Sequence, residues 1–225
     1  FHQNLDIPPG CPMSIKFAPS SSAFAFVGGP AFAGVKVTLM KARMLIRTKR
    51  VCPELILAHK EMLQTANIRI PHNRVTVNKY AIGNGIQSNT IPLNFPAKLP
   101  KRIFIGFVLN TAATGNIGQN PFEFRNFGLE DLRIAPSGES VPNGGIITDY
   151  ATGDYQRAYL NTLSALGLDN DNRAIWLKPD EFASGDNIHG FKLAPGPLEG
   201  TVVSAPKSAG SLAVFFKFAA PLTAA

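Results

Sequence analysis

Glycine and proline divide this chain into short segments. There are 20 Gly and 18 Pro among 225 residues, and they follow no regular repeat. Short apolar runs lie between them, and the longest, IFIGFVL, has 7 residues. Because apolar runs bounded by turn residues are typical of β-strands, the pattern predicts many strands and turns rather than disorder. A membrane helix needs roughly 20 apolar residues, so we expect no membrane insertion.

Period-two alternation marks the expected strands. They are CPMSIKFAP (11–19), the segment 35–51, NRVTVNKYAI (73–82), KRIFIGFVLN (101–110), two short strands in LRIAPSGESVP (132–142), and GSLAVFFKFAAPL (210–222). KRIFIGFVLN is apolar at nearly every position, as in a strand buried on both faces.

Two segments have helical patterns. Residues 53–64 place Pro53 in a first helical turn, and residues 154–167 end at Gly167, a typical helix terminator. Residues 169–190 are polar and loop-like. There is no βαβ alternation and no repeat of 20–50 residues. The expected fold is an all-β jelly-roll β-sandwich, with one or two short helices in connections, and residues 1–225 form one domain.

The strand expected at 35–51 changes its face midway. Its apolar residues fall on odd positions from Val35 to Leu39 and on even positions from Ala42 to Ile46. A period-two pattern changes face only at a bulge or a break, which predicts one near Met40–Lys41.

Positive charge is concentrated in the same segment. The net charge is +7, and five basic residues fall within 41–50. Lys41, Arg43, Arg47 and Lys49 share one face of an extended strand, which makes them candidates for an electrostatic contact. Three interpretations stay open: a solvated strand face, a non-specific contact to DNA phosphates, or a contact to the acidic edge of a partner.

Cysteine use and the N-terminus favour a reducing compartment. Cys11 and Cys52 are too few for a disulfide framework and are expected to be free thiols. No N-x-S/T sequon and no signal-peptide pattern occur. The chain does not begin with Met, so it is expected to be a fragment or a processed product.

No catalytic pattern stands out, so we expect neither an enzyme nor a bound cofactor or metal. The four histidines, at positions 2, 59, 72 and 189, have no metal-ligand spacing and are interpreted as solvated or capping. The carboxylates of Asp180, Glu181 and Asp186 could hold a cation or act as an acid/base pair, but polar loops commonly carry such capping acids.

The stretch NPFEFRNFGL, residues 120–129, invites two interpretations. Asn120-Pro121-Phe122 matches the NPF ligand that some endocytic adaptor domains read in exposed, flexible segments. However, Phe124 and Phe127 follow closely, and expected strands flank both sides. Burying three Phe side chains contributes several kcal/mol, on the order of 2 each, so we expect a packed connection.

The order of several short motifs resembles a known family. They run from LAH in the first expected helix through LPKR and NPFEF to YQRAY in the second helix and GSL in the last strand. This order resembles the C-terminal half of the major capsid protein of Polinton/Maverick elements and the related adintoviruses. The matching positions are Leu57, Ala58, His59, Leu63, Pro71, Arg74, Leu99 to Arg102, Gly106, Asn120 to Phe122, Phe124, Phe127, Tyr155, Ala158, Tyr159, Leu163, Gly167 and Gly210 to Leu212.

The resemblance implies a function in assembly. It implies one half of a double jelly-roll protein, the C-terminal half of a larger chain, that forms trimeric capsomers and then a shell around double-stranded DNA. Implied partners are further copies and other capsid proteins such as a penton. The implied location is the virion capsid, after synthesis in the host cytoplasm or nucleus. Two segments differ from the family: FKLAPGP (191–197) stands for its usual FDLTP-like strand, and no further strand follows GSLAVFFKF.

Seven phenylalanines are the expected core-packing residues: Phe104, Phe107, Phe122, Phe124, Phe127, Phe215 and Phe216. Low charge, 16% of residues against about 25% in typical proteins, favours large apolar subunit contacts. Two other classes stay open. One is a lectin-like or adaptor module that binds a ligand through residues 169–190, and the other is a hydrolase that uses Asp186.

Overall fold

The structure is a computed structural model, and it contains two compact units. It describes residues 7, 12–29, 32, 34–67, 74–95, 99–136, 138–169, 177–193 and 210–223. Unit 1 comprises Phe1–Ser20 and Lys36–Asn78, and unit 2 comprises Ser21–Val35 and Lys79–Ala225. All strands of the described part belong to unit 2, whereas the expected domain spanned residues 1–225.

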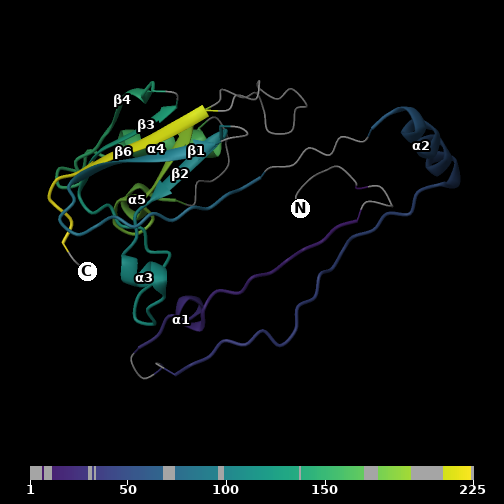
Figure 1. Cartoon of the computed structure of the whole chain (residues 1–225), viewed down its shortest axis with the longest axis horizontal. Helices are drawn as coiled ribbons and strands as arrows, with labels where there is room; N and C mark the ends of the chain where they lie inside the picture. Colours follow the sequence, from purple (N-terminus) through teal and green to yellow (C-terminus); the bar gives the residue numbers. More distant parts are fainter. Residues whose placement is uncertain are drawn as a thin grey trace. The chain divides into compact units, whose positions relative to one another are not determined.

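Unit 2 is built on a four-stranded antiparallel sheet. Its strands are β1 (Ser88–Phe95), β3 (Leu129–Pro136), β4 (Val141–Ile147) and β6 (Gly210–Phe218). The order is β1-β6-β3-β4, so the last strand lies between the first and the third (Figure 1). The buried positions of β6 alternate with half-buried or exposed ones, as a strand with one buried face requires.

A second antiparallel sheet pairs β2 (Arg102–Gly106) with β5 (Ile188–Lys192). Side chains of both sheets meet in one apolar core. Within it, the ring centroids of Phe107 lie 5.7 Å from Phe216 and 5.2 Å from Phe218, both edge to face. Unit 2 is therefore mostly antiparallel β, with a few short helices, and is compatible with a β-sandwich.

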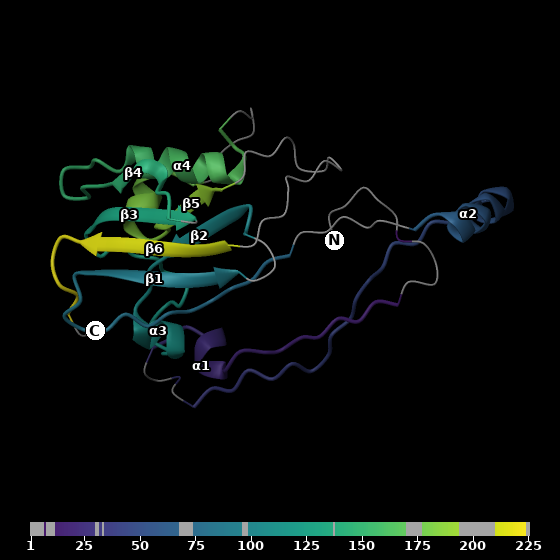
Figure 2. The same ribbon diagram turned by 45° about the horizontal axis from the view of Figure 1, so that its top comes forward.

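The helices are short and lie in the connections (Figures 1 and 2). They are α1 (Ser22–Ala25), α2 (Pro53–Thr65), α3 (Asn110–Thr114), α4 (Gln156–Leu166) and α5 (Pro179–Ser184). The helices expected at 53–64 and 154–167 are confirmed as α2 and α4. Gly167 ends α4 in the left-handed conformation, with φ of 77°.

Helix α4 covers the outer edge of β5. The Thr162 hydroxyl accepts a hydrogen bond from the Gly190 N–H at 2.9 Å, and its proton faces the Ile188 carbonyl at 3.0 Å. The Asn161 amide donates to the Gly190 carbonyl at 2.6 Å. Gly190 permits this approach, because a Cβ there would lie 2.8 Å from the Cβ of Ala165. Side chains of a helix thus satisfy the backbone of a strand edge.

Three expected strands do not form in the described residues. The described residues of these segments, 12–19, 35–51 and 74–82, belong to no β-strand, and Cys11 and Asn73 lie outside the described part. The bulge expected near Met40–Lys41 therefore has no paired strand in which to occur. A period-two pattern indicates that a segment could form a strand with one buried face. In the described part, no apolar surface covers that face along the length of these segments.

Two strands that sequence reasoning missed are β1 and β5. β1 contains Pro92, which reads as a strand breaker, although Ile91, Leu93 and Phe95 alternate correctly. β5 lies at the end of the segment 169–190, which was expected to be a loop, and residues 170–176 are outside the described part. The strands expected in LRIAPSGESVP and GSLAVFFKFAAPL are confirmed as β3, β4 and β6.

Two of the seven expected core phenylalanines are exposed. Phe104 is 45% exposed, because Ile103 and Ile105 take the inward positions of β2 and leave Phe104 on the other face. Phe122 is 63% exposed, and its ring packs edge to face against Phe24 at 5.7 Å. The expectation of a core role is wrong for both.

The other five phenylalanines differ in how far their side chains are buried. Phe107 and Phe216 are buried, and Phe127 packs half-buried against the core. Phe124 and Phe215 are half-buried. The Phe124 ring lies on Gly106, whose added Cβ would be only 2.6 Å from it, and the Arg133 guanidinium lies 5.7 Å from the centre of the Phe215 ring.

Candidate assembly surface

Unit 1 has no buried residue in its described part. Every described residue from 12 to 20, from 36 to 67 and from 74 to 78 is exposed. Extended segments connect to the two ends of α2, which is itself exposed along its whole length (Figure 1). Ordering a segment costs conformational entropy that burial normally offsets, and the described residues of unit 1 provide no such burial among themselves.

Large apolar side chains are abundant on unit 1. Eighteen are exposed in its described part: Ile7, Met13, Ile15, Phe17, Val37, Leu39, Met40, Met44, Leu45, Ile46, Val51, Leu55, Ile56, Leu57, Met62, Leu63, Val75 and Val77. At roughly 50 Å² of exposed apolar area each, they present on the order of 1,000 Å². A standard protein interface buries about 800 Å² on each partner, so unit 1 has enough apolar area for one.

The two faces of residues 41–47 differ in chemistry. Ala42, Met44 and Ile46 occupy alternate positions, with Met44 52% and Ile46 59% exposed. Lys41, Arg43 and Arg47 occupy the other positions together with Leu45, which is 95% exposed, and Lys49 continues the same series. An extended backbone places these two sets on opposite sides, so this segment has one apolar face and one mainly basic face.

The whole net charge of the protein belongs to unit 1. Unit 1 contains ten Lys and Arg against three Asp and Glu, whereas unit 2 contains twelve of each. No acidic residue occurs between Asp6 and Glu54. Two copies of unit 1 would therefore repel each other, while unit 2 presents a neutral surface to it.

The NPFEFRNFGL stretch is a hydrogen-bonded connection in unit 2. Asn120 Oδ1 accepts the Phe122 N–H at 3.0 Å, and Pro121 is buried. The Phe124 N–H donates to the Gly185 carbonyl at 2.7 Å, and the Asn126 amide donates to the Ala183 carbonyl at 2.8 Å. These contacts fasten the stretch to the end of α5, so it is a packed element rather than an extended ligand, with Phe122 as its exposed part.

The three acidic candidates serve the local structure of α5. The Glu181 carboxylate accepts the Lys178 N–H at 3.3 Å and pairs with the Lys178 ammonium at 3.5 Å. Asp180 lies in the first turn of α5, and Asp186 forms a single parallel β-bridge with Phe124. Within the described residues, no three His, Cys, Asp or Glu side chains gather into a metal-binding group.

A buried polar cluster went unnoticed in the sequence. His189, expected to be solvated or capping, is 0% exposed, which corrects that interpretation. The Asn187 amide donates to the Tyr150 hydroxyl at 2.8 Å and to the Phe182 carbonyl at 2.9 Å, so its oxygen faces His189 Nε2 at 2.9 Å. His189 Nε2 therefore carries the proton, and Nδ1 is buried without a hydrogen-bond partner in the described structure.

Burial shifts the pKa values of two side chains in this cluster. It lowers the pKa of His189 to about 4, which keeps the imidazole neutral. Burial also raises the pKa of Tyr150 to about 12, against the opposing effect of its hydrogen bond from Asn187. The signal in the sequence is the spacing of His189 and Phe191 in IHGFK. A spacing of two residues puts both side chains on one face of a strand, and both are buried. His59 is exposed on α2, and His2 and His72 lie outside the described residues.

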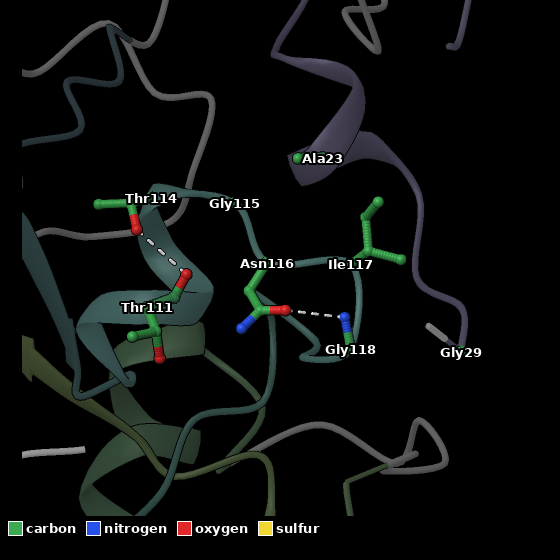
Figure 3. A pocket seen from close by; sticks show the side chains of 8 residues that line it. All are labelled: Ala23, Gly29, Thr111, Thr114, Gly115, Asn116, Ile117 and Gly118. Atoms are coloured by element: carbon green, nitrogen blue, oxygen red, sulfur yellow. Dashed lines mark hydrogen bonds between the residues drawn. The ribbon is translucent and has the colours of Figure 1, made fainter. Parts of the chain in front are cut away.

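A pocket of about 550 Å³ lies between the α3 loop and the segment around α1 (Figure 3). Its polar side chains are engaged within the loop: the Thr114 hydroxyl donates to the Thr111 carbonyl, and Asn116 Oδ1 accepts the Gly118 N–H at 2.9 Å. No charged residue lines it. The pocket therefore offers no charged group to a ligand.

Cys52 is exposed and forms no disulfide, and Cys11 lies outside the described residues. Among the helices that the structure describes, none has the length and apolar character needed to cross a bilayer.

Comparison with known proteins gives a partial match of unassigned function. The chain is 31% identical over 103 residues to an uncharacterized protein of Caenorhabditis elegans, which covers 45% of this chain. The match spans 25% of the length of that relative. No family model matches the chain, and no solved structure matches it.

Proposed function

We propose that this chain is a structural capsid protein. In this proposal it forms a jelly-roll domain, the C-terminal half of a double jelly-roll protein, whose copies assemble into trimers and then into a closed shell around double-stranded DNA. The proposal involves no bond chemistry, and its energy comes from burial between subunits.

The observation that carries the proposal is the nesting of the strand pairs. A jelly roll is a long antiparallel hairpin wrapped on itself, so its first strand pairs with its last and its second with the one before the last. Here β1 pairs with β6, β2 with β5 and β3 with β4, all antiparallel. The pairs are nested in the order that such wrapping produces.

The sheet orders support the same interpretation. An eight-stranded jelly roll has the orders 1-8-3-6 and 2-7-4-5. If its innermost hairpin, strands 4 and 5, is removed and the rest are renumbered, the orders become 1-6-3-4 and 2-5, which are those of this chain. Helix α4 then covers the edge of β5 at which strand 4 would pair.

Two further observations favour a shell protein over a ligand-binding module. Unit 1 exposes apolar area on the scale of a subunit interface. The pocket of Figure 3 has no charged lining. The motif order shared with Polinton/Maverick and adintovirus capsid proteins points in the same direction, toward a virion location and partners such as a penton.

The test is the mass of the purified protein in solution, measured by light scattering over a range of concentrations. A shell protein should give particles near three times the 24.2 kDa of the chain, or larger closed particles in negative-stain micrographs. A monomer at every concentration would contradict the proposal. Saturable binding of a sugar or a peptide by that monomer would favour the binding module instead.

A further inference from the structure

Resting on the proposed assembly, we infer that residues 41–47 of one copy add as a strand to the outer edge of β2 in unit 2 of a second copy. The apolar face of this segment then extends the core beside β2, and its basic face remains outside.

A second copy is favoured by area and by charge. The apolar area of unit 1 is on the order of 1,000 Å², against about 800 Å² that a stable interface buries on each partner. The excess of basic residues makes contact between two copies of unit 1 unfavourable, whereas unit 2 has equal numbers of basic and acidic residues. Unit 2 is thus a better surface for unit 1 than a second unit 1 is, and we place this contact in another copy.

Three of the four sheet edges in the described structure are unsuitable for the addition of another strand. On β1, Pro92 has no N–H and the Thr90 N–H is taken by the Asn89 side chain at 2.7 Å. β4 contains Gly144 and Gly145 at φ of 81° and 74°, outside strand conformation. β5 is covered by α4. Such edges are protected against strand addition.

The remaining edge is that of β2, centred on Phe104. Phe104 lies opposite Gly190, whose N–H and C=O both point to α4. In an antiparallel pair this makes Phe104 and Gly190 a non-hydrogen-bonded pair, so the N–H and C=O of Phe104 point away from β5. No described strand pairs with that side, and a neighbouring chain can hydrogen-bond there.

The side chains of the two strands are also matched. Ile103 and Ile105 lie on the inner face of β2, half-buried against the core. A strand added beside them places Ala42, Met44 and Ile46 on that face, and Lys41, Arg43 and Arg47 with the single apolar Leu45 on the solvent face. Burying the apolar set while leaving the cations hydrated is the lower-energy arrangement.

Two variants test the two halves of this contact. We call residues 41–47 the arm. Met44→Asp places a charge on the apolar face of the arm, and Phe104→Pro removes the outward N–H of β2 while leaving its bonds to β5. Each should weaken association of the full chain at least tenfold, measured by light scattering. The matched controls, Arg43→Gln on the basic face and Phe104→Val with its N–H intact, should change it less than threefold.

Mixing the two variants makes the test independent of misfolding. The Phe104→Pro copy has an intact arm and the Met44→Asp copy has an intact β2 edge, so an equimolar mixture should give one-to-one dimers although neither variant associates alone. No recovery, or variants that assemble like the unmodified chain, would overturn the arm contact while leaving the shell proposal in place. A monomeric unmodified chain would overturn both, and association only with added DNA would replace the second copy by nucleic acid.

Discussion

The buried imidazole of His189 couples the stability of unit 2 to pH. Its pKa is lowered to about 4 in the folded chain from 6.5, so between these values the unfolded chain binds the extra proton. Stability should therefore rise with pH from about 4 to 6.5, by up to roughly 3 kcal/mol. Denaturant unfolding measured across this range should lose that dependence in His189→Gln and keep it in His59→Gln, which changes an exposed histidine.

Gly190 is needed because α4 approaches β5 closely. A Cβ at this position would lie 2.8 Å from Ala165 and 3.1 Å from the Cα of Thr162, and the latter is backbone. Gly190→Ala should destabilise unit 2 by about 1–3 kcal/mol in denaturant unfolding. Gly185→Ala is the control, because a Cβ on Gly185 meets nothing within 4 Å and its φ of −160° suits any residue. Equal stability of both variants would contradict the close packing.

The Thr162 hydroxyl belongs to one of the two α4 side chains that hydrogen-bond the backbone of Gly190 at the edge of β5. Thr162→Val keeps the shape of the side chain but leaves the buried Gly190 N–H without its acceptor. The expected loss is about 1–3 kcal/mol of unfolding free energy. Thr114→Val, in the exposed helix α3, should cost less than about 0.5 kcal/mol. If the two substitutions had the same effect, the hydroxyl would not be what covers the edge of β5.

Helix α4 shows which kind of element can be predicted from the local sequence. α4 has an apolar stripe and ends at Gly167, and both features are local, so its position could be predicted to within about two residues. β1 was missed because Pro92 argues against a strand, although a proline is tolerated on the outer side of an edge strand. Whether a strand is at an edge is decided by its neighbours, which local patterns do not specify.

The two units differ in net charge and in exposure to solvent. Limited proteolysis should therefore cleave them at different rates. Trypsin should cleave the unassembled chain first within residues 41–50, where basic residues are exposed, while the part of unit 2 from Lys79 onward persists as a stable fragment. Assembly should slow this cleavage at least tenfold if the arm is covered by a neighbour. Equal cleavage rates before and after assembly, followed by gel electrophoresis and mass spectrometry, would show that the arm remains exposed in the particle.

The β-rich character of the chain, α2 and α4, the strands β3, β4 and β6, and the concentration of charge in residues 41–50 followed from local composition and periodicity alone. The depth of each phenylalanine, the burial of His189 with Asn187 and Tyr150, and the absence of a strand in the described residues 35–51 did not. These depend on which surfaces meet: alternation can assign Phe104 and Ile105 to opposite faces of β2, but only the packing of two sheets selects the face that is buried. The nested pairing of β1 with β6 and β2 with β5 is likewise a contact between distant segments, and local propensity carries no information about such partners.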